Sequence, residues 1–271
     1  MRRPRAPWWV KAAIQTSLSA VPGGEKINYW LQEGYDVDGI FRQGLETYEF
    51  VRPHVGADWS SLRICEVGVG RFPCQALVFW LKGARNQVLV DIRPLFNFKH
   101  FATFLQAATR YGFADSLGEV RKVRSMAELL ERMGADYEIQ RVETLQPPAA
   151  FDLVLTTNVL EHIRKERLPS FINDVSKLVK PGGLFYHRVD FADHFHHFDP
   201  RRPADAHYAT PDWLWAIIGE NRIHTVNRVR PEQMEVHLLG TGLTMISRDV
   251  QELTGKYVLR KDVAMGRATG C

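Results

Sequence analysis

Apolar residues recur at helical spacing through the first part of the chain. Within residues 41–51, for example, they fall three or four positions apart, which is the period of an amphipathic helix. Turn-forming residues at 21–24 and 34–39 divide this part of the chain, so two or three helices are expected. We therefore predict a helical N-terminal extension over residues 1–58.

After Trp59 short apolar runs alternate with longer amphipathic stretches. The runs typical of strands are 62–67, 87–92, 137–142, 151–157 and 184–189. The helical stretches between them are 74–83, 97–112, 124–133 and 165–179. This alternation predicts an α/β fold, because parallel strands need long crossover connections, which are usually helices. The expected product is a doubly wound, Rossmann-like sheet that is mostly parallel and covered on both faces.

The C-terminal part of the chain has a different pattern. Residues 243–250 and 256–263 are strand-like and are separated by a short turn containing glycine, which predicts an antiparallel hairpin at the sheet's edge. Lys-Pro-Gly-Gly at 180–183 is expected to end a helix and turn into the fifth strand. We assign residues 59–271 to one domain, with an insert at 191–240.

Composition narrows the class of protein. The chain has 271 residues, 45% of them hydrophobic and 24% charged, so it can bury a core of ordinary size. Its formal charge of +4 comes from scattered arginines without a long basic block, which makes nucleic acid an unlikely partner. Three cysteines without metal-ligand spacing favour a reducing, cytoplasmic location. No apolar run is long enough to cross a membrane.

Candidate binding chemistry begins at the end of the first predicted strand. Glu66, Gly68 and Gly70 follow an apolar run and precede a predicted helix. Glycines at this point let the backbone turn sharply and approach a ligand without a Cβ in the way. Asp91 ends the next strand, 23 residues after Gly68, where a carboxylate can accept hydrogen bonds from both hydroxyls of a ribose. The two features fit an adenosine-bearing cofactor.

Residues 66 and 73 disfavour a dinucleotide. Pro73 stands where the third glycine of a pyrophosphate-binding loop would be. The negative charge of Glu66 would repel a pyrophosphate, whereas it suits a cationic ligand without phosphate.

The wider pattern resembles the class I S-adenosylmethionine-dependent methyltransferases, of the kind found in bacteria for small molecules and glycans. The motifs that carry the resemblance are Glu66-x-Gly68-x-Gly70, Asp91, Phe151-Asp152-Leu153-Val154, Asn158-Val159-Leu160-Glu161-His162 and Lys180-Pro181-Gly182-Gly183. They cover roughly residues 60 to 190, and their order and spacing are more specific than any single motif. The resemblance implies S-adenosyl-L-methionine as cofactor and S-adenosyl-L-homocysteine as product.

The resemblance also implies roles for individual residues. Glu66, Gly68 and Gly70 would line the methionine and ribose side of the cofactor, and Asp91 would hold the ribose hydroxyls. Ile92 would flank the adenine. The remaining positions are Asn158, which would face the cofactor or the acceptor, Glu143, a candidate contact to the adenine, and Phe72, which replaces the family's third glycine.

The acceptor side is rich in histidine and aspartate. His162 follows the fourth strand, where it could serve as a general base or simply start a helix. Asp190 and His194 could form a pair in which the carboxylate orients the imidazole and raises its basicity. A divalent metal held by residues within 190–197 is the less favoured alternative, so we assign no metal ligands.

These residues favour O-methylation of a hydroxyl on a small molecule or a sugar, in a biosynthetic role. The apolar segment 208–239 and the N-terminal helices are expected to roof the acceptor site. Two alternatives stay open: an RNA methyltransferase, and a catalytically silent module that binds the cofactor on the same fold.

Overall fold

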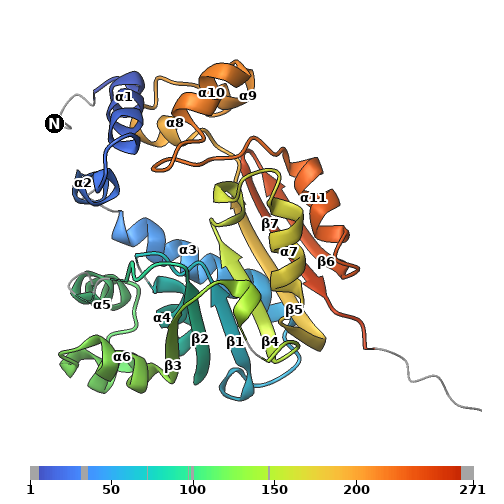
Figure 1. Ribbon diagram of the computed structural model, residues 1–271. Coiled ribbons are helices and arrows are strands. Elements are labelled where there is room, and N and C mark those ends of the chain that lie inside the picture. The colour runs from blue at the N-terminus through green and yellow to red at the C-terminus, as the bar shows by residue number, and fades with distance from the viewer. Residues whose placement is uncertain are drawn as a thin grey trace, which may run out of the picture.

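The computed structural model describes residues 6–31, 36–71, 73–96, 98, 101–145 and 147–263. Within these ranges seven strands form one sheet in the order β3-β2-β1-β4-β5-β7-β6 (Figure 1). The strands are β1 (Arg63–Val67), β2 (Asn86–Asp91), β3 (Ala135–Ile139), β4 (Phe151–Thr157), β5 (Val179–Asp190), β6 (Thr244–Gln251) and β7 (Thr254–Arg260). The first five are parallel, and β7 is antiparallel to both of its neighbours, β5 and β6. The predicted fold class is confirmed.

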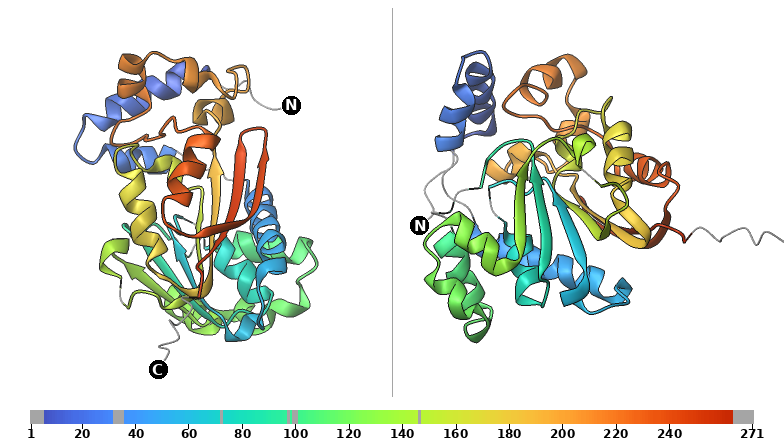
Figure 2. Two further views of the ribbon diagram at one scale, coloured as in Figure 1. Left: turned by 90° about the vertical axis from the view of Figure 1, so that its right-hand side faces the viewer. Right: turned by 60° about the horizontal axis from the view of Figure 1, so that its bottom comes forward.

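Helices cover both faces of the sheet (Figures 1 and 2). Alternate residues of each strand point to opposite faces, so Ile64 joins one buried cluster and Cys65 the other. The helices whose residues belong to the first cluster are α3 (Val37–Val51), α4 (Cys74–Leu81), α5 (Phe101–Arg110) and α6 (Met126–Met133). Those of the second are α7 (Leu168–Ser176) and α11 (Pro231–Leu239). The sheet is therefore doubly wound.

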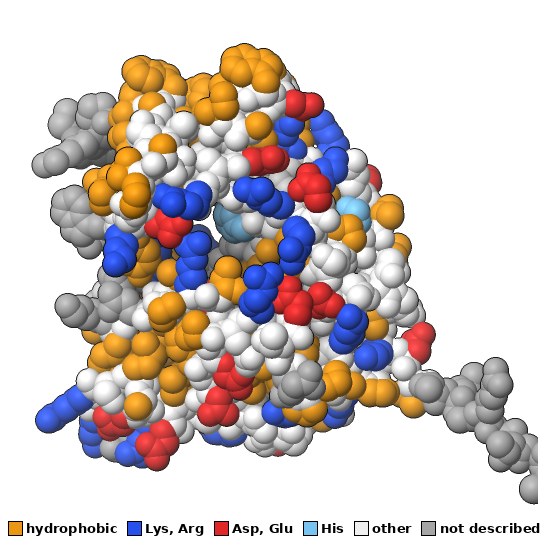
Figure 3. All heavy atoms as spheres, viewed as in Figure 1, with side chains coloured by type: hydrophobic (Ala, Val, Ile, Leu, Met, Phe, Trp, Pro, Cys, Tyr) orange, Lys and Arg blue, Asp and Glu red, His pale blue; other side chains and the backbone are white. Residues whose placement is uncertain are grey.

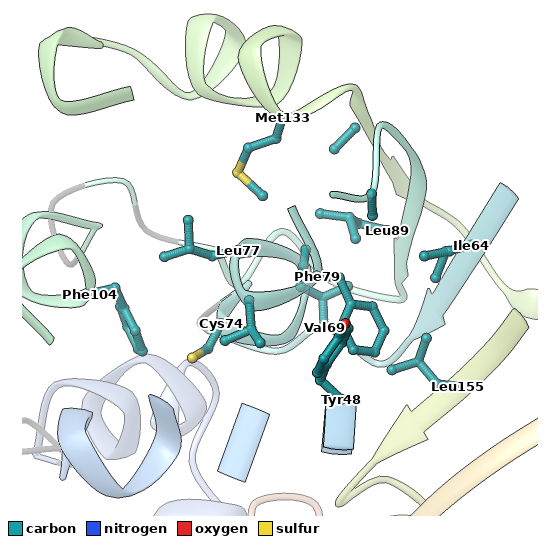
Figure 4. Packing of buried hydrophobic residues seen from close by; sticks show 14 of the residues in the cluster. Tyr48, Ile64, Val69, Cys74, Leu77, Phe79, Leu89, Phe104, Met133 and Leu155 are labelled. Atoms are coloured by element: carbon teal, nitrogen blue, oxygen red, sulfur yellow. The ribbon is translucent and has the colours of Figure 1, made fainter. Parts of the chain in front are cut away.

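Helix α3 packs into the first cluster through its apolar stripe. Phe41, Tyr48 and Val51 are buried, and the Tyr48 ring lies 4.7 Å from the Trp59 ring between centroids. Figure 4 shows Tyr48 beside Phe79 of α4. The helix begins earlier than the predicted break at 34–39 allows, because the Asp36 side chain accepts a hydrogen bond from the Gly39 amide and caps it. Gly39 thus lies inside α3, while positions 32–35 are outside the described residues.

The remaining helices gather beyond the carboxyl ends of the strands. They are α1 (Trp8–Ser19), α2 (Gly24–Leu31), α8 (His194–Phe198), α9 (Ala206–Ala209) and α10 (Asp212–Ile218). Helix α1 lies against α8 and α10, although nearly 200 residues separate them in sequence (Figures 1 and 2). A third apolar cluster joins them through Ala12, Phe195 and Trp215. None of the described helices is long and apolar enough to cross a membrane.

Three local predictions were wrong. The third strand occupies 135–139 rather than 137–142, and Val142 belongs to a short 3₁₀ turn. Residues 180–183 lie within β5 rather than in a turn after a helix, since α7 ends at Ser176. They form a bulge-like irregularity, because β5 has more residues than β4 between the pairs Phe151–Val179 and Leu153–Leu184. Gly182 has a φ of 78° there. The turn between β6 and β7 has only two residues, at 252–253.

Candidate functional site

The carboxyl ends of β1 and β2 lie side by side. Val67 pairs with Val90 in the parallel register, and the Gly68 amide donates to the Val90 carbonyl at 2.8 Å. Two residues later, the Gly70 amide donates to Oδ2 of Asp91, also at 2.8 Å. The glycine turn and the carboxylate that the sequence pairs in one site are therefore in direct contact.

The two glycines of this turn are needed for different reasons. Both have positive φ, 84° at Gly68 and 66° at Gly70, a region that L-residues with a Cβ avoid. A Cβ at Gly68 would meet Cγ2 of Val159 at 2.4 Å, so this position is also closed by packing. A Cβ at Gly70 would meet nothing within 4 Å. Gly70 thus borders open space, in which a ligand can approach the backbone.

Glu66 lies at the base of a cavity of about 170 Å³ beside this turn. Its side chain is 5% exposed, and Oε2 has no hydrogen-bond partner among the described residues. Burial, reinforced by the nearby charge of Asp91, raises the pKa of Glu66 to about 8. An unpartnered carboxyl of this kind gains stability from a cationic or hydrogen-bond-donating ligand. The cavity is lined by Ile40, Gln43, Gly44, Glu66, Gly68, Val69, Arg71, Cys74, Gln75, Thr157 and Asn158.

The other predicted cofactor contacts lie around the same edge. Asn158 has a φ of 54° and lines the cavity, and its amide donates to the Arg188 carbonyl at 2.9 Å. Ile92 follows Asp91 and is 69% exposed. Glu143 instead lies near two arginines, Arg141 and Arg167, and lines neither of the cavities described here. Phe72 lies outside the described residues.

A second cavity, of about 710 Å³, adjoins the first. The two share Ile40 and Arg71 in their walls. Figure 3 shows the surface hollow with histidine inside it and Lys and Arg side chains around its rim. Its lining residues are Lys11, Gln15, Glu25, Asn28, Tyr29, Ile40, Arg71, Arg93, Leu95, His162, His194, His197, Arg222, Ile223, His224 and Thr225. We call this space the histidine chamber.

His162 ends the short 3₁₀ helix 160–162 after β4 and reaches into the chamber. Its Nδ1 lies 2.7 Å from the Thr225 carbonyl oxygen. Because a carbonyl only accepts, Nδ1 carries the proton and Nε2 of the neutral ring keeps its lone pair. The surrounding protein desolvates the ring and lowers the pKa of His162. The ring is therefore neutral at pH 7, with a basic nitrogen available.

Asp190 is bonded to a different histidine from the one predicted. Its Oδ2 lies 2.8 Å from Nε2 of His197 but 3.7 Å from Nε2 of His194, which is too long for a hydrogen bond. The hydrogen bond to the carboxylate raises the pKa of His197, whereas burial lowers the pKa of His194. The reason is local: His197 lies in the last turn of α8 and turns back onto the end of β5.

His194 lies at the centre of the imidazole cluster. Its ring centroid is 5.0 Å from that of His162 in an edge-to-face arrangement and 6.0 Å from that of His224. Buried nitrogens of His194 and His224 have no hydrogen-bond partner among the described residues. His224 is not among the predicted site residues, because only the fold brings the 221–225 loop against α8.

Among the residues that the structure describes, two overlapping sets of side chains have donor atoms close enough to hold a metal ion. Glu161, His162 and His194 form one set, and Asp190, His194 and His197 the other, each with its donor atoms within 4.8 Å of one another. Imidazoles and carboxylates together suit first-row divalent ions. The ammonium of Lys11 opposes such an ion, since its charge already lowers the pKa of His194.

A known protein family matches part of the chain. Residues 100–187 match the family model described as a methyltransferase domain. No curated protein matches the chain.

Solved structures share the fold at low sequence identity. A 1,6-didemethyltoxoflavin-N1-methyltransferase from Burkholderia thailandensis, crystallised with 1,6-didemethyltoxoflavin and S-adenosylhomocysteine, is 17% identical with a TM-score of 0.50 over 97% of this chain and 93% of that one. A S-adenosylmethionine-dependent methyltransferase from Methanosarcina mazei is 16% identical with a TM-score of 0.52, covering 80% and 98%. An O-methyltransferase family protein from B. thailandensis is 11% identical with a TM-score of 0.51, covering 84% and 59%.

The order of strands in the sheet agrees with the fold of these solved methyltransferases. The match to a methyltransferase domain covers residues 100–187 of the chain. The structural neighbours include both N- and O-methyltransferases, so the shared fold does not define the acceptor atom.

Proposed function

We propose that this protein transfers a methyl group from S-adenosyl-L-methionine to a hydroxyl of a small molecule or sugar, with S-adenosyl-L-homocysteine as product. The observation that carries the proposal is the position of His162. Its basic Nε2 is available in a chamber that adjoins the cavity lined by Glu66. A methyl donor in one cavity and a hydroxyl in the other would meet where the two share their wall.

The smaller cavity suits the methionine part of the cofactor, and Gly70, Asp91 and Ile92 lie beside it, outside its lining. The unpartnered Oε2 of Glu66 suits the ammonium of its methionine part, and the open space at Gly70 admits its ribose against the backbone. Asp91 would accept from the ribose hydroxyls, with Gly68 shaping the turn, Ile92 beside the adenine and Asn158 facing the methionine side. The cofactor, when bound, supplies an electrophilic methyl group on a sulfonium.

His162 acts as general base in this proposal. A hydroxyl needs to lose its proton as it attacks, and a positioned neutral imidazole removes it. The Thr225 carbonyl holds the ring in the tautomer that does so. His194 packs edge to face on His162 and positions it, and Asp190 adds a negative charge that stabilises the imidazolium once it forms.

The histidine chamber would be the acceptor site. Lys11, Gln15 and Tyr29 of the N-terminal helices and the 221–225 loop of the insert form its roof. A volume of about 710 Å³ is in the range of small-molecule sites. A biosynthetic, cytoplasmic enzyme fits this picture, in which Cys65 and Cys74 are both buried free thiols.

Calorimetry followed by an acceptor screen tests the proposal. In calorimetry, S-adenosylhomocysteine should bind with a stoichiometry of one. In the screen, members of a panel of hydroxyl compounds should be methylated, with S-adenosylmethionine converted to S-adenosylhomocysteine, whereas matched amines should not. Methylation of the amines alone would refute the choice of oxygen. A silent module would bind no cofactor or turn over no acceptor. An RNA enzyme would bind RNA with a steep dependence on salt, which a titration at two ionic strengths detects.

A further inference from the structure

The histidine chamber carries more positive than negative charge. Four cationic side chains line it, Lys11, Arg71, Arg93 and Arg222, against the single carboxylate of Glu25 among its described lining residues. Three of the four come from segments outside the cofactor turn. An excess of cations at one small cavity favours an anionic occupant.

Lys11 carries its charge into this chamber from α1. Its Nζ lies over the rings of Phe195 and Phe198, at 5.9 and 5.4 Å from their centroids. Within the described part of the chain it forms no ion pair, because the carboxylate that attracts it most, Asp193, is bonded to Arg202 at 2.6 Å. Burial lowers the pKa of Lys11, so the ammonium is destabilised where it stands. An anion beside it would remove that cost.

Arg93 and Arg222 share one carboxylate. Nη1 of Arg93 lies 3.4 Å from Oε2 of Glu25, and Nε of Arg222 lies 3.4 Å from Oε1 of the same side chain. One negative charge between two guanidiniums leaves each able to bind a further oxyanion. The pair also joins the ends of β2, α2 and the 221–225 loop around the chamber's mouth.

We propose that the acceptor is an anionic small molecule, whose carboxylate or phosphate group binds Lys11, Arg93 and Arg222 while its hydroxyl lies at His162. That the anion is a methyl acceptor rests on the proposed function. The anion-binding site itself does not depend on that function. Carboxylate and phosphate share the chemistry that guanidinium and ammonium groups recognise. The same cations oppose a divalent metal ion in the chamber.

Binding of two simple probes tests the site. Malonate and inorganic pyrophosphate are titrated into the full chain at one fixed ionic strength, with affinity read by calorimetry. We expect saturable binding of one or both at a stoichiometry of one. Lys11→Met and Arg222→Met should each weaken it by about tenfold or more. The preferred probe then distinguishes a carboxylate acceptor from a phosphorylated one.

Lys177→Met is the matched control. Lys177 lies outside the chamber, in an exposed pair with Asp174, and its replacement removes the same charge. S-adenosylhomocysteine binding by each variant reports that the cofactor site is folded, since Lys11 and Arg222 do not line that cavity. Absence of probe binding to the unaltered chain, or equal loss in Lys11→Met and Lys177→Met, overturns the anion site. If the unaltered protein does not bind S-adenosylhomocysteine, the proposed function is refuted instead.

Discussion

Oδ2 of Asp91 accepts a hydrogen bond from the backbone amide of Gly70 at 2.8 Å, so the tip of β2 holds the turn that follows β1. Oδ1 of the same carboxylate accepts from the Arg93 amide at 3.1 Å. A carboxylate oxygen has room for more than one donor, so both remain able to accept from a ligand. The carboxylate is thereby held in one orientation before any ligand binds.

Asp91→Ala should weaken S-adenosylhomocysteine binding by about 1 to 3 kcal/mol, because it removes charge-assisted hydrogen bonds to the ribose and frees the Gly70 turn. Calorimetry measures the change. Asp174→Asn, in an exposed pair on α7, serves as the control and should bind normally. Unchanged affinity in Asp91→Ala would remove this residue from the cofactor site.

Gly68→Ala and Gly70→Ala should separate stability from binding. At Gly68 a methyl group combines left-handed strain with overlap on Val159, and we expect a loss of about 3 kcal/mol in the free energy of unfolding. At Gly70 only the backbone strain applies, and we expect a loss of about 1 kcal/mol in the free energy of unfolding. The added methyl group would, however, occupy the open space through which a ligand reaches the backbone. Urea unfolding and cofactor titration of both variants check this. Equal stability losses would contradict the packing argument.

Periodicity and alternation predicted the parallel sheet, because burial on two faces leaves a strong pattern in β1, β2 and β4. Positions 180–183 were misread for a physical reason: Pro and Gly stop helices, but they also permit an irregular strand, and local sequence does not separate the two. Similarly, Asp36 caps α3 in a stretch where nearby glycines predicted a break.

That Glu66, Gly70 and Asp91 are neighbours could be predicted from the sequence, because the carboxyl ends of parallel strands lie at the same edge of a sheet. Only some residues of the histidine chamber could be predicted from the sequence. His162 and His194 were predicted as site residues and line the chamber, whereas Asp190 does not line it and is hydrogen-bonded to His197, which does. Lys11 and His224, which were not predicted, reach the same space from α1 and a distant loop. Lys11 and His224 come close together because Phe195 and Trp215 pack in one apolar cluster, and no local sequence motif indicates this packing.

The raised pKa of Glu66 predicts a pH dependence of stability. Its folded-state pKa of about 8 lies above the ordinary value of 4.5, so the stabilisation of the protonated form is complete below pH 4.5 and is lost as pH rises to about 8. Between these limits Glu66 should contribute a fall of about 1.4 kcal/mol per pH unit. Glu66→Gln should lack that part of the slope, measured by urea unfolding across this range. Identical slopes in the two proteins would show that Glu66 is ionised in the fold.

His162→Ala should lower turnover by about 100- to 10,000-fold while cofactor affinity stays unchanged, because the base is lost and the smaller cavity is intact. Turnover is measured with whichever hydroxyl compound the screen identifies. His237→Ala is the control, since this histidine on α11 lines neither cavity. Equal rates in the two variants would exclude His162 as base.

Arg202→Met should destabilise the fold by about 3 to 5 kcal/mol, since it leaves the Asp193 carboxylate buried without its cation. The guanidinium also lies 4.0 Å from the centroid of the Trp8 ring, so its loss loosens α1 from the insert. Arg110→Met, which breaks an ion pair with Asp38 that is exposed on both sides, should cost less than about 1 kcal/mol. Urea unfolding compares the two. Because α1 carries Lys11, Arg202→Met should also weaken binding of the anionic probes while the cofactor still binds; intact probe binding would mean that the Asp193–Arg202 pair does not hold the chamber's roof.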